Sequence, residues 1–155
     1  MELMPNVHLI PGVRGANAYL LLDSELTLVD AGMTGQTESI LGYIESLDLA
    51  ADSLARIVIT HNHLDHVGSL AELKRRTSAQ VVAHQAEAPF ISGKETMPSP
   101  PGLLMCLLER LPLLPRAETA PVDITVQDGD QLGLLGGATV VHVPGHTPGS
   151  LSLIH

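Results

Sequence analysis

The stretch Ile57-Val58-Ile59-Thr60-His61-Asn62-His63-Leu64-Asp65-His66 decides how this chain folds and what it can bind. Its apolar start predicts a buried strand, and three imidazoles and a carboxylate follow at once. Divalent ions such as zinc bind neutral imidazole nitrogens and carboxylate oxygens that converge on one point. Side chains at i and i+2 of an extended segment face the same way, so His61 and His63 can reach one ion together. Asp65 and His66 can address that ion or a neighbouring one.

A non-metal interpretation exists for each histidine taken alone, as a solvated loop residue or a hydrogen-bonded core residue. It does not explain the cluster, because so many polar groups at the end of a strand are costly unless something holds them. A second segment, Pro144-Gly145-His146-Thr147-Pro148-Gly149, supports the metal hypothesis. Proline restricts φ and glycine permits unusual φ, so this loop can be stiff and sharply turned and can aim His146 at an ion.

The motif His-x-His-x-Asp-His after an apolar strand resembles the signature of the metallo-β-lactamase superfamily of metallohydrolases. Two further segments resemble family elements: Val143 to Ser150, which contains His146, and Leu28 to Gly32, which contains Asp30. The resemblance implies an α+β fold, the αββα sandwich, with residues 1–155 forming a single, partial domain. It also implies that His61, His63 and His146 hold a first metal ion and that Asp65 and His66 contribute to a second.

Two further family ligands have no counterpart in this sequence. The family uses an aspartate that bridges both ions, usually in a Gly-Asp dipeptide after the Pro-Gly-His segment, and a late histidine. His155 follows His146 too closely to take either role. The C-terminal portion of the sandwich is therefore expected to be missing, either because the chain is a truncated form or fragment or because it is a natural short homologue. Weak or absent turnover is expected of the chain as it stands.

The resemblance implies a hydrolase that cleaves an ester, thioester, lactone or amide bond of a small-molecule substrate. Zinc, as one or two ions, would provide a metal-bound hydroxide near neutral pH. Asp65 is the catalytic candidate, since it could orient or deprotonate the nucleophilic water. Asp30 is either a partner that orients a ligating histidine or a turn residue at the end of a strand. Two alternatives stay open: an iron-dependent redox or dioxygenase enzyme, and a catalytically silent domain with an incomplete metal site.

Composition limits the other function classes. A formal net charge of -9 argues against a nucleic-acid partner, which would require a basic face. The N-terminus lacks a basic region followed by an apolar one, so a cytoplasmic location is expected. The leucine-rich segment from Leu103 to Leu114 is too short and too interrupted to span a membrane, and Cys106 within it is expected to be a small buried hydrophobe. Missing sheet and helix would leave apolar surface exposed, so homo-oligomers are possible.

Hydrophobic periodicity predicts the remaining elements. The residues before position 30 predict an antiparallel meander, and Asp128-Gly129-Asp130 predicts a tight turn. The segment between Pro89 and Pro121 predicts an excursion with one short helix, whose leucines either cover the core or form a pocket wall or an oligomer contact. His8, His84 and His142 receive no metal role. Strands are expected at residues 7–10, 18–22, 26–29, 57–60, 80–83, 139–143 and 151–154, and helices at 37–47 and 69–76.

Overall fold

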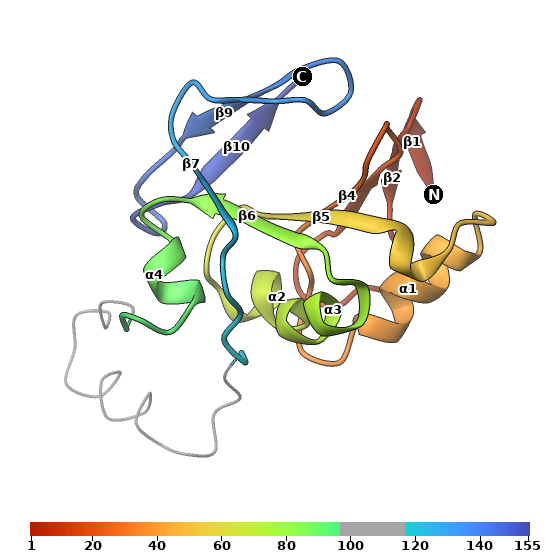
Figure 1. Ribbon diagram of the computed structural model, residues 1–155, viewed down its shortest axis with the longest axis horizontal. Helices are drawn as coiled ribbons and strands as arrows, with labels where there is room; N and C mark the ends of the chain where they lie inside the picture. The colour runs from red at the N-terminus through yellow and green to blue at the C-terminus, as the bar shows by residue number, and fades with distance from the viewer. Residues whose placement is uncertain (97–116) are drawn as a thin grey trace.

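The computed structural model describes residues 1–96 and 117–155. A seven-stranded mixed sheet forms the middle layer, with helices on one face and a three-stranded sheet on the other (Figure 1). These are three layers of the expected sandwich. The expectations for the leucine-rich segment and for Cys106 concern positions that lie outside the described residues.

The large sheet combines an antiparallel half with a parallel half. Its strands lie in sequence order, antiparallel from β1 to β4 and parallel from β4 to β7. The expected meander before position 30 is confirmed, whereas β1 and β7, which have three residues each, were not foreseen. The strands are β1 (Glu2–Met4), β2 (Val7–Leu9), β3 (Tyr19–Leu21), β4 (Leu26–Val29), β5 (Leu54–Ile59), β6 (Gln80–His84) and β7 (Ile124–Val126).

Strand β5 is buried on both faces, which explains its continuous apolar sequence. Ile57 and Ile59 pack into the core beneath the helices, whereas Val58 packs into the core between the two sheets. The helices contribute apolar stripes such as Ile40 and Ile44 to the first of these cores. The helical elements are α1 (Thr37–Glu45), the 3-10 turn η1 (Ala51–Ser53), α2 (Leu64–Val67), α3 (Leu70–Thr77) and the short α4 (Ala88–Ile91).

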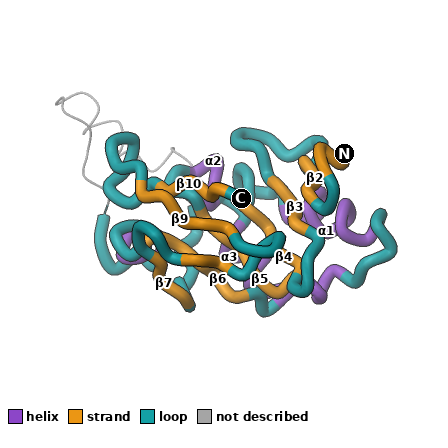
Figure 2. The backbone as a smooth tube through the Cα atoms, turned by 90° about the horizontal axis from the view of Figure 1, so that it is seen from above, coloured by secondary structure: helices purple, strands orange, loops and turns teal. Residues whose placement is uncertain are grey.

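The small sheet lies over the parallel half of the large one, as Figure 2 shows from above. Its order is β10-β9-β8, all antiparallel, with β8 (Gln131–Leu132), β9 (Ala138–His142) and β10 (Leu151–Ile154). The turn at residues 128–130, with Gly129 at φ +83°, joins β7 to β8 and so passes the chain from one sheet to the other. The loop between β9 and β10 carries His146.

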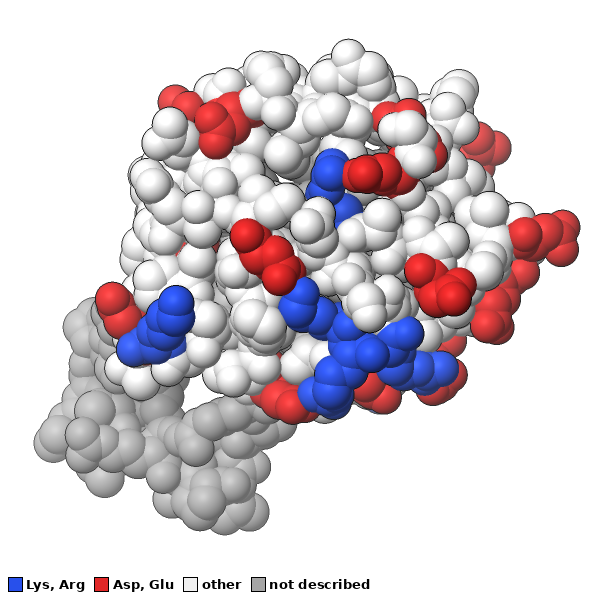
Figure 3. All heavy atoms as spheres, viewed as in Figure 1, with Lys and Arg blue, Asp and Glu red and all other residues white. Residues whose placement is uncertain are grey.

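The surface of α3 shows a group of basic side chains among acidic ones (Figure 3). The three basic side chains of α3 are each paired with a carboxylate, so they do not form the free basic face that phosphates require. The pairs are Lys74 with Asp123, Arg75 with Glu118 and Arg76 with Glu38.

Within residues 1–96 and 117–155, no helix is both long and apolar enough to cross a bilayer.

Gly68 joins α2 to α3 at a place with no room for a side chain. A Cβ at this position would lie 2.3 Å from the backbone nitrogen of Thr34 and 2.6 Å from the carbonyl oxygen of Leu64. We expect Gly68→Ala to lower the free energy of unfolding by more than about 2 kcal/mol, since backbone cannot move aside as a flexible side chain can. Urea denaturation measures this.

Gly42→Ala is the matched control, because Gly42 lies within α1 and a Cβ there meets nothing within 4 Å. Alanine should raise the free energy of unfolding by up to about 1 kcal/mol through its higher helix propensity. Equal effects of the two substitutions would contradict the argument from close backbone contact.

Candidate metal centre

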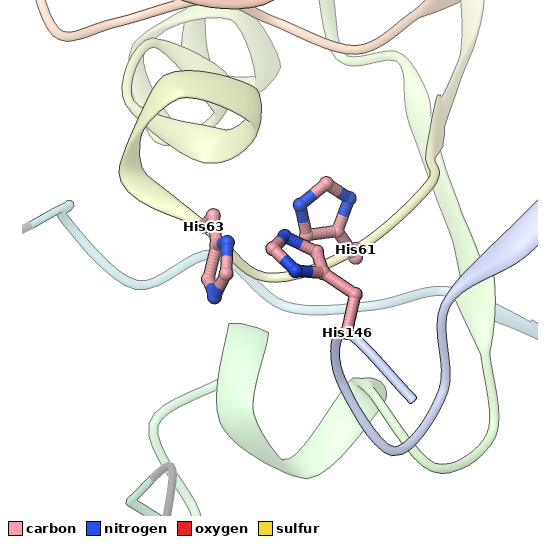
Figure 4. A group of neighbouring side chains, drawn as sticks. All are labelled: His61, His63 and His146. Carbon is pink, nitrogen blue, oxygen red and sulfur yellow. The ribbon is translucent and has the colours of Figure 1, made fainter. Parts of the chain in front are cut away.

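Three imidazoles converge beside the end of β5. The side chains of His61, His63 and His146 each offer one nitrogen, and these nitrogens lie within 4.8 Å of one another. The ring centroid of His146 is 4.7 Å from that of His61 and 4.4 Å from that of His63. Figure 4 shows the three side chains pointing toward one another from two separate loops. The geometry suits a single ion held by three nitrogens.

The two loops are held together by backbone as well as by side chains. His61 and His63 follow β5, and His63 immediately precedes α2. The backbone N–H of Leu151 at the start of β10 donates to the carbonyl of Thr60 over 3.0 Å. This bond fixes the loop of His146 beside the end of β5, so the small sheet determines where the third imidazole lies.

His61 presents a bare nitrogen to the centre. The Thr60 hydroxyl donates to Asp30 over 2.8 Å, so toward His61 Nδ1, 3.2 Å away, it can only accept. Nδ1 therefore carries the proton and Nε2 the lone pair. Nε2 is buried and has no hydrogen-bond partner among residues 1–96 and 117–155. A buried polar atom is rarely left without a partner, and a bound metal ion would supply one.

The electrostatic environment lowers the pKa of two imidazoles of the centre. Burial, and then the neighbouring imidazoles His66, His63 and His146, lower the pKa of His61 to about 4. Burial and the imidazole of His146 also lower the pKa of His63. Both rings are thus neutral at pH 7, which is the form that binds metal.

Asp65 and His66 form a pair beside the three imidazoles but are not members of the convergent group. Asp65 Oδ2 lies 3.8 Å from His66 Nε2, and His66 Nδ1 lies 2.8 Å from the Asp30 carboxylate. Burial acts to lower the pKa of His66, but the hydrogen bond and charge of Asp30 outweigh it and raise the pKa. The assignment of a second ion to Asp65 and His66 stays a prediction, as does the catalytic role of Asp65.

An open pocket of about 630 Å³ leads to these residues. Asn17 and Tyr19 line it together with Asp30, Asp65 and His146. Polar groups on a concave wall can orient a substrate at a reactive centre. The pocket therefore joins the candidate metal centre to a space that can admit a small molecule.

The structure adds residues that sequence reasoning did not single out. Thr60 contacts Asp30, His61 and His66 through one hydroxyl, and its only sequence signal was its place at the strand end. Glu87 is fully buried beside both ligand loops, and no local motif announced it.

Besides His155, three histidines have no predicted metal role, and they are not members of the convergent group. His8 Nδ1 is 3.0 Å from the hydroxyl of Tyr43. The buried ring of His84 stacks on that of His142, with centroids 4.0 Å apart. Stacking at this distance packs β6 of the large sheet against β9 of the small one.

The metal-free chain should lose stability in mild acid. The pKa of His61 is about 4 when folded, against about 6.5 in an unfolded chain. Its contribution is thus complete above pH 6.5 and is lost as the pH falls toward 4. We expect this one residue to lower the free energy of unfolding by on the order of 1–2 kcal/mol between pH 7 and pH 5. Urea denaturation at the two pH values, with chelator present, measures this difference in the free energy of unfolding.

His66 acts in the opposite direction, because its raised pKa stabilises the fold below pH 6.5 and that contribution is lost as the pH rises through the folded value. The comparison that isolates His61 is therefore with His61→Gln, in which the difference in stability between pH 7 and pH 5 should shrink. An unchanged difference would show that His61 is not held neutral by the fold.

Comparison with known proteins agrees with this geometry. The profile of the metallo-beta-lactamase superfamily matches residues 11–154. A probable metallo-hydrolase of Bacillus subtilis is 33% identical over 150 residues, which cover 91% of this chain and 56% of that protein. A hydroxyacylglutathione hydrolase of Pseudomonas syringae is 32% identical over 158 residues, 98% of this chain and 47% of that protein. This chain thus spans about half the length of these relatives.

Among solved structures, a subclass B3 metallo-beta-lactamase of Bradyrhizobium japonicum superimposes with a TM-score of 0.82 at 31% identity. The match covers 99% of this chain and 55% of that one. The layered arrangement of sheets and helices is therefore the metallo-β-lactamase fold, as the sequence resemblance implied.

Proposed function

This chain belongs to the metallo-β-lactamase superfamily, and on that premise we propose that it is a zinc-dependent hydrolase of small carbonyl compounds. The observation that carries the proposal is the convergence of His61, His63 and His146 around the unpaired, buried Nε2 of His61. Three imidazoles beside an open pocket that can admit a further ligand are the donor set of catalytic zinc sites. The residues present thus fit the metal that the family implies.

In this proposal His61, His63 and His146 hold one ion, and Asp65 and His66 supply ligands to a second. A bound zinc ion lowers the pKa of a coordinated water toward about 7, which provides a nucleophile near neutral pH. Asp65, whose side chain is half-exposed at the pocket, orients the attacking water and accepts its proton. Asp30 holds His66 with Nδ1–H donated, so that Nε2, which lies 3.8 Å from Asp65 Oδ2, is the nitrogen left to bind an ion.

We further propose a thioester as the substrate class. Support comes from relatives named hydroxyacylglutathione hydrolase, including one from Haemophilus influenzae that is 30% identical over 96% of this chain. The cyclic amide of a β-lactam is the second candidate, favoured by the likeness to the subclass B3 enzyme. Both substrates have a carbonyl carbon that the same nucleophile can attack. The residues that line the pocket determine which of the two is preferred.

The test is a panel of a glutathione thioester, an aryl ester, a lactone and a β-lactam. The metal content of the isolated chain is measured first by elemental analysis, and each compound is then incubated with the chain loaded with zinc. We expect weak, zinc-dependent turnover that is greatest for the thioester and is lost in His146→Ala. Iron in place of zinc would support the redox alternative, and tight zinc binding without turnover of any substrate would replace the hydrolase proposal with a silent metal-binding domain.

A further inference from the structure

Glu87 is a completely buried carboxylate that touches both ligand-bearing loops. It lies between β6 and α4 and has no exposed surface. Its Oε2 accepts the backbone N–H of Asn62 over 2.7 Å, and its Oε1 accepts that of Gly149 over 2.7 Å. Asn62 separates His61 from His63, and Gly149 follows His146 in the second loop. One carboxylate therefore bridges the two segments that carry the three imidazoles.

The second loop approaches Glu87 so closely that only glycine fits. A Cβ on Gly149 would lie 2.7 Å from Glu87 Cγ and 2.9 Å from Nδ1 of His84. The contact therefore depends on both residues. Gly149 has no side chain that would clash, and Glu87 is long enough to reach two backbone amides.

The charge of Glu87 has no cationic partner in the described part of the chain. No Lys, Arg or His side chain of residues 1–96 or 117–155 comes within ion-pair distance of this carboxylate. A buried carboxylate with only two neutral donors is costly, and a nearby cation offsets that cost. The charge of Glu87 acts on the imidazole of His63, one of the three that form the centre, and on that of His84.

We propose that Glu87 is a positioning residue that clamps the two ligand loops together and favours a cation between them by its charge. It does not touch the ion. This inference rests on the proposed function, because it assumes that His61, His63 and His146 bind zinc. A role in folding alone would lower stability equally with and without zinc, whereas a clamp for the centre changes the affinity for zinc.

The experiment compares Glu87→Gln with Glu72→Gln. Glu72 is the matched control, since it is a part-buried glutamate that accepts a hydrogen bond from Thr37 away from the centre. Zinc affinity is measured at pH 7 by competition with a chromophoric chelator, and stability by urea denaturation with and without zinc. We expect Glu87→Gln to weaken zinc binding ten- to hundredfold and to reduce the stabilisation that zinc confers. Glu72→Gln should leave zinc affinity unchanged.

The clamp is also tested without metal. Amide hydrogen exchange in the metal-free chain should become faster at Asn62 or Gly149 in Glu87→Gln, because the amide group of glutamine accepts only one of the two bonds. This separates the two proposals: an unaltered chain that binds no zinc refutes the proposed function, whereas unchanged exchange refutes the clamp. Zinc affinity of Glu87→Gln within twofold of the unaltered chain also overturns the inference.

Should Glu87→Gln fail to fold, Glu87→Asp takes its place. Aspartate keeps the charge but is one methylene shorter, so it cannot reach both amides. A loss of zinc affinity is expected here too, and unaltered affinity would refute the clamp.

Discussion

Replacing His61 with alanine is expected to weaken zinc binding by more than about a hundredfold while the metal-free chain stays folded. Structural zinc sites with four ligands provide about 10–16 kcal/mol, or roughly 3 kcal/mol for each ligand. Each 1.4 kcal/mol changes a dissociation constant about tenfold. His61 also brings a buried nitrogen, Nε2, that has no hydrogen-bond partner in the described part of the chain. Its removal therefore takes away a ligand without breaking a strong hydrogen bond.

His8→Ala is the matched control, because His8 is a buried imidazole on β2 that contacts Tyr43 of α1, away from the centre. It should cost stability and leave zinc affinity unchanged. Isothermal titration with zinc gives both affinities, and circular dichroism of the metal-free variants checks the fold. A His61→Ala variant that binds zinc within tenfold of the unaltered chain would remove the basis for a three-imidazole centre.

Asp30→Asn should destabilise the fold by about 2–4 kcal/mol. The Asp30 carboxylate accepts the N–H of Thr60 over 2.9 Å, the hydroxyl of Thr60 over 2.8 Å and Nδ1–H of His66 over 2.8 Å. Asparagine tolerates the left-handed backbone of this position, φ +61°, so the change isolates the side-chain chemistry. Its NH₂ group cannot accept a hydrogen bond, which leaves at least one buried donor unpaired.

The pKa of His66 should fall in the same variant, since Asp30 raises it by hydrogen bond and charge. The share of the stability loss due to His66 is then largest below pH 6.5 and disappears as the pH rises through the folded pKa. Urea denaturation and NMR titration of the metal-free chain measure the two effects. Asp48→Asn is the control, because Asp48 has the same backbone conformation, φ +60°, but is exposed. Similar losses at both positions would contradict the proposed network.

Much of the fold follows from local sequence patterns. The strand before the histidines, the helices over residues 37–45 and 70–77 and the meander before position 30 were all expected from apolar periodicity. The strands that escaped prediction, β1, β7 and β8, have two or three residues each. Such short segments carry no periodic signal of their own, because their neighbours in the sheet supply the hydrogen bonds that define them.

The sequence by itself showed that four candidate metal-binding side chains lie together, because His61, His63, Asp65 and His66 follow one another directly after an apolar strand. Only the tertiary structure decided which distant groups complete it. Asp30 meets His66 from 36 positions away, and Glu87 joins Asn62 to Gly149 across separations of 25 and 62. Contacts of this kind depend on strand order and on how the small sheet docks, so the sequence left two roles open for Asp30 and gave none to Glu87. Nothing in the local sequence around a single glutamate such as Glu87 indicates that the fold will bury it.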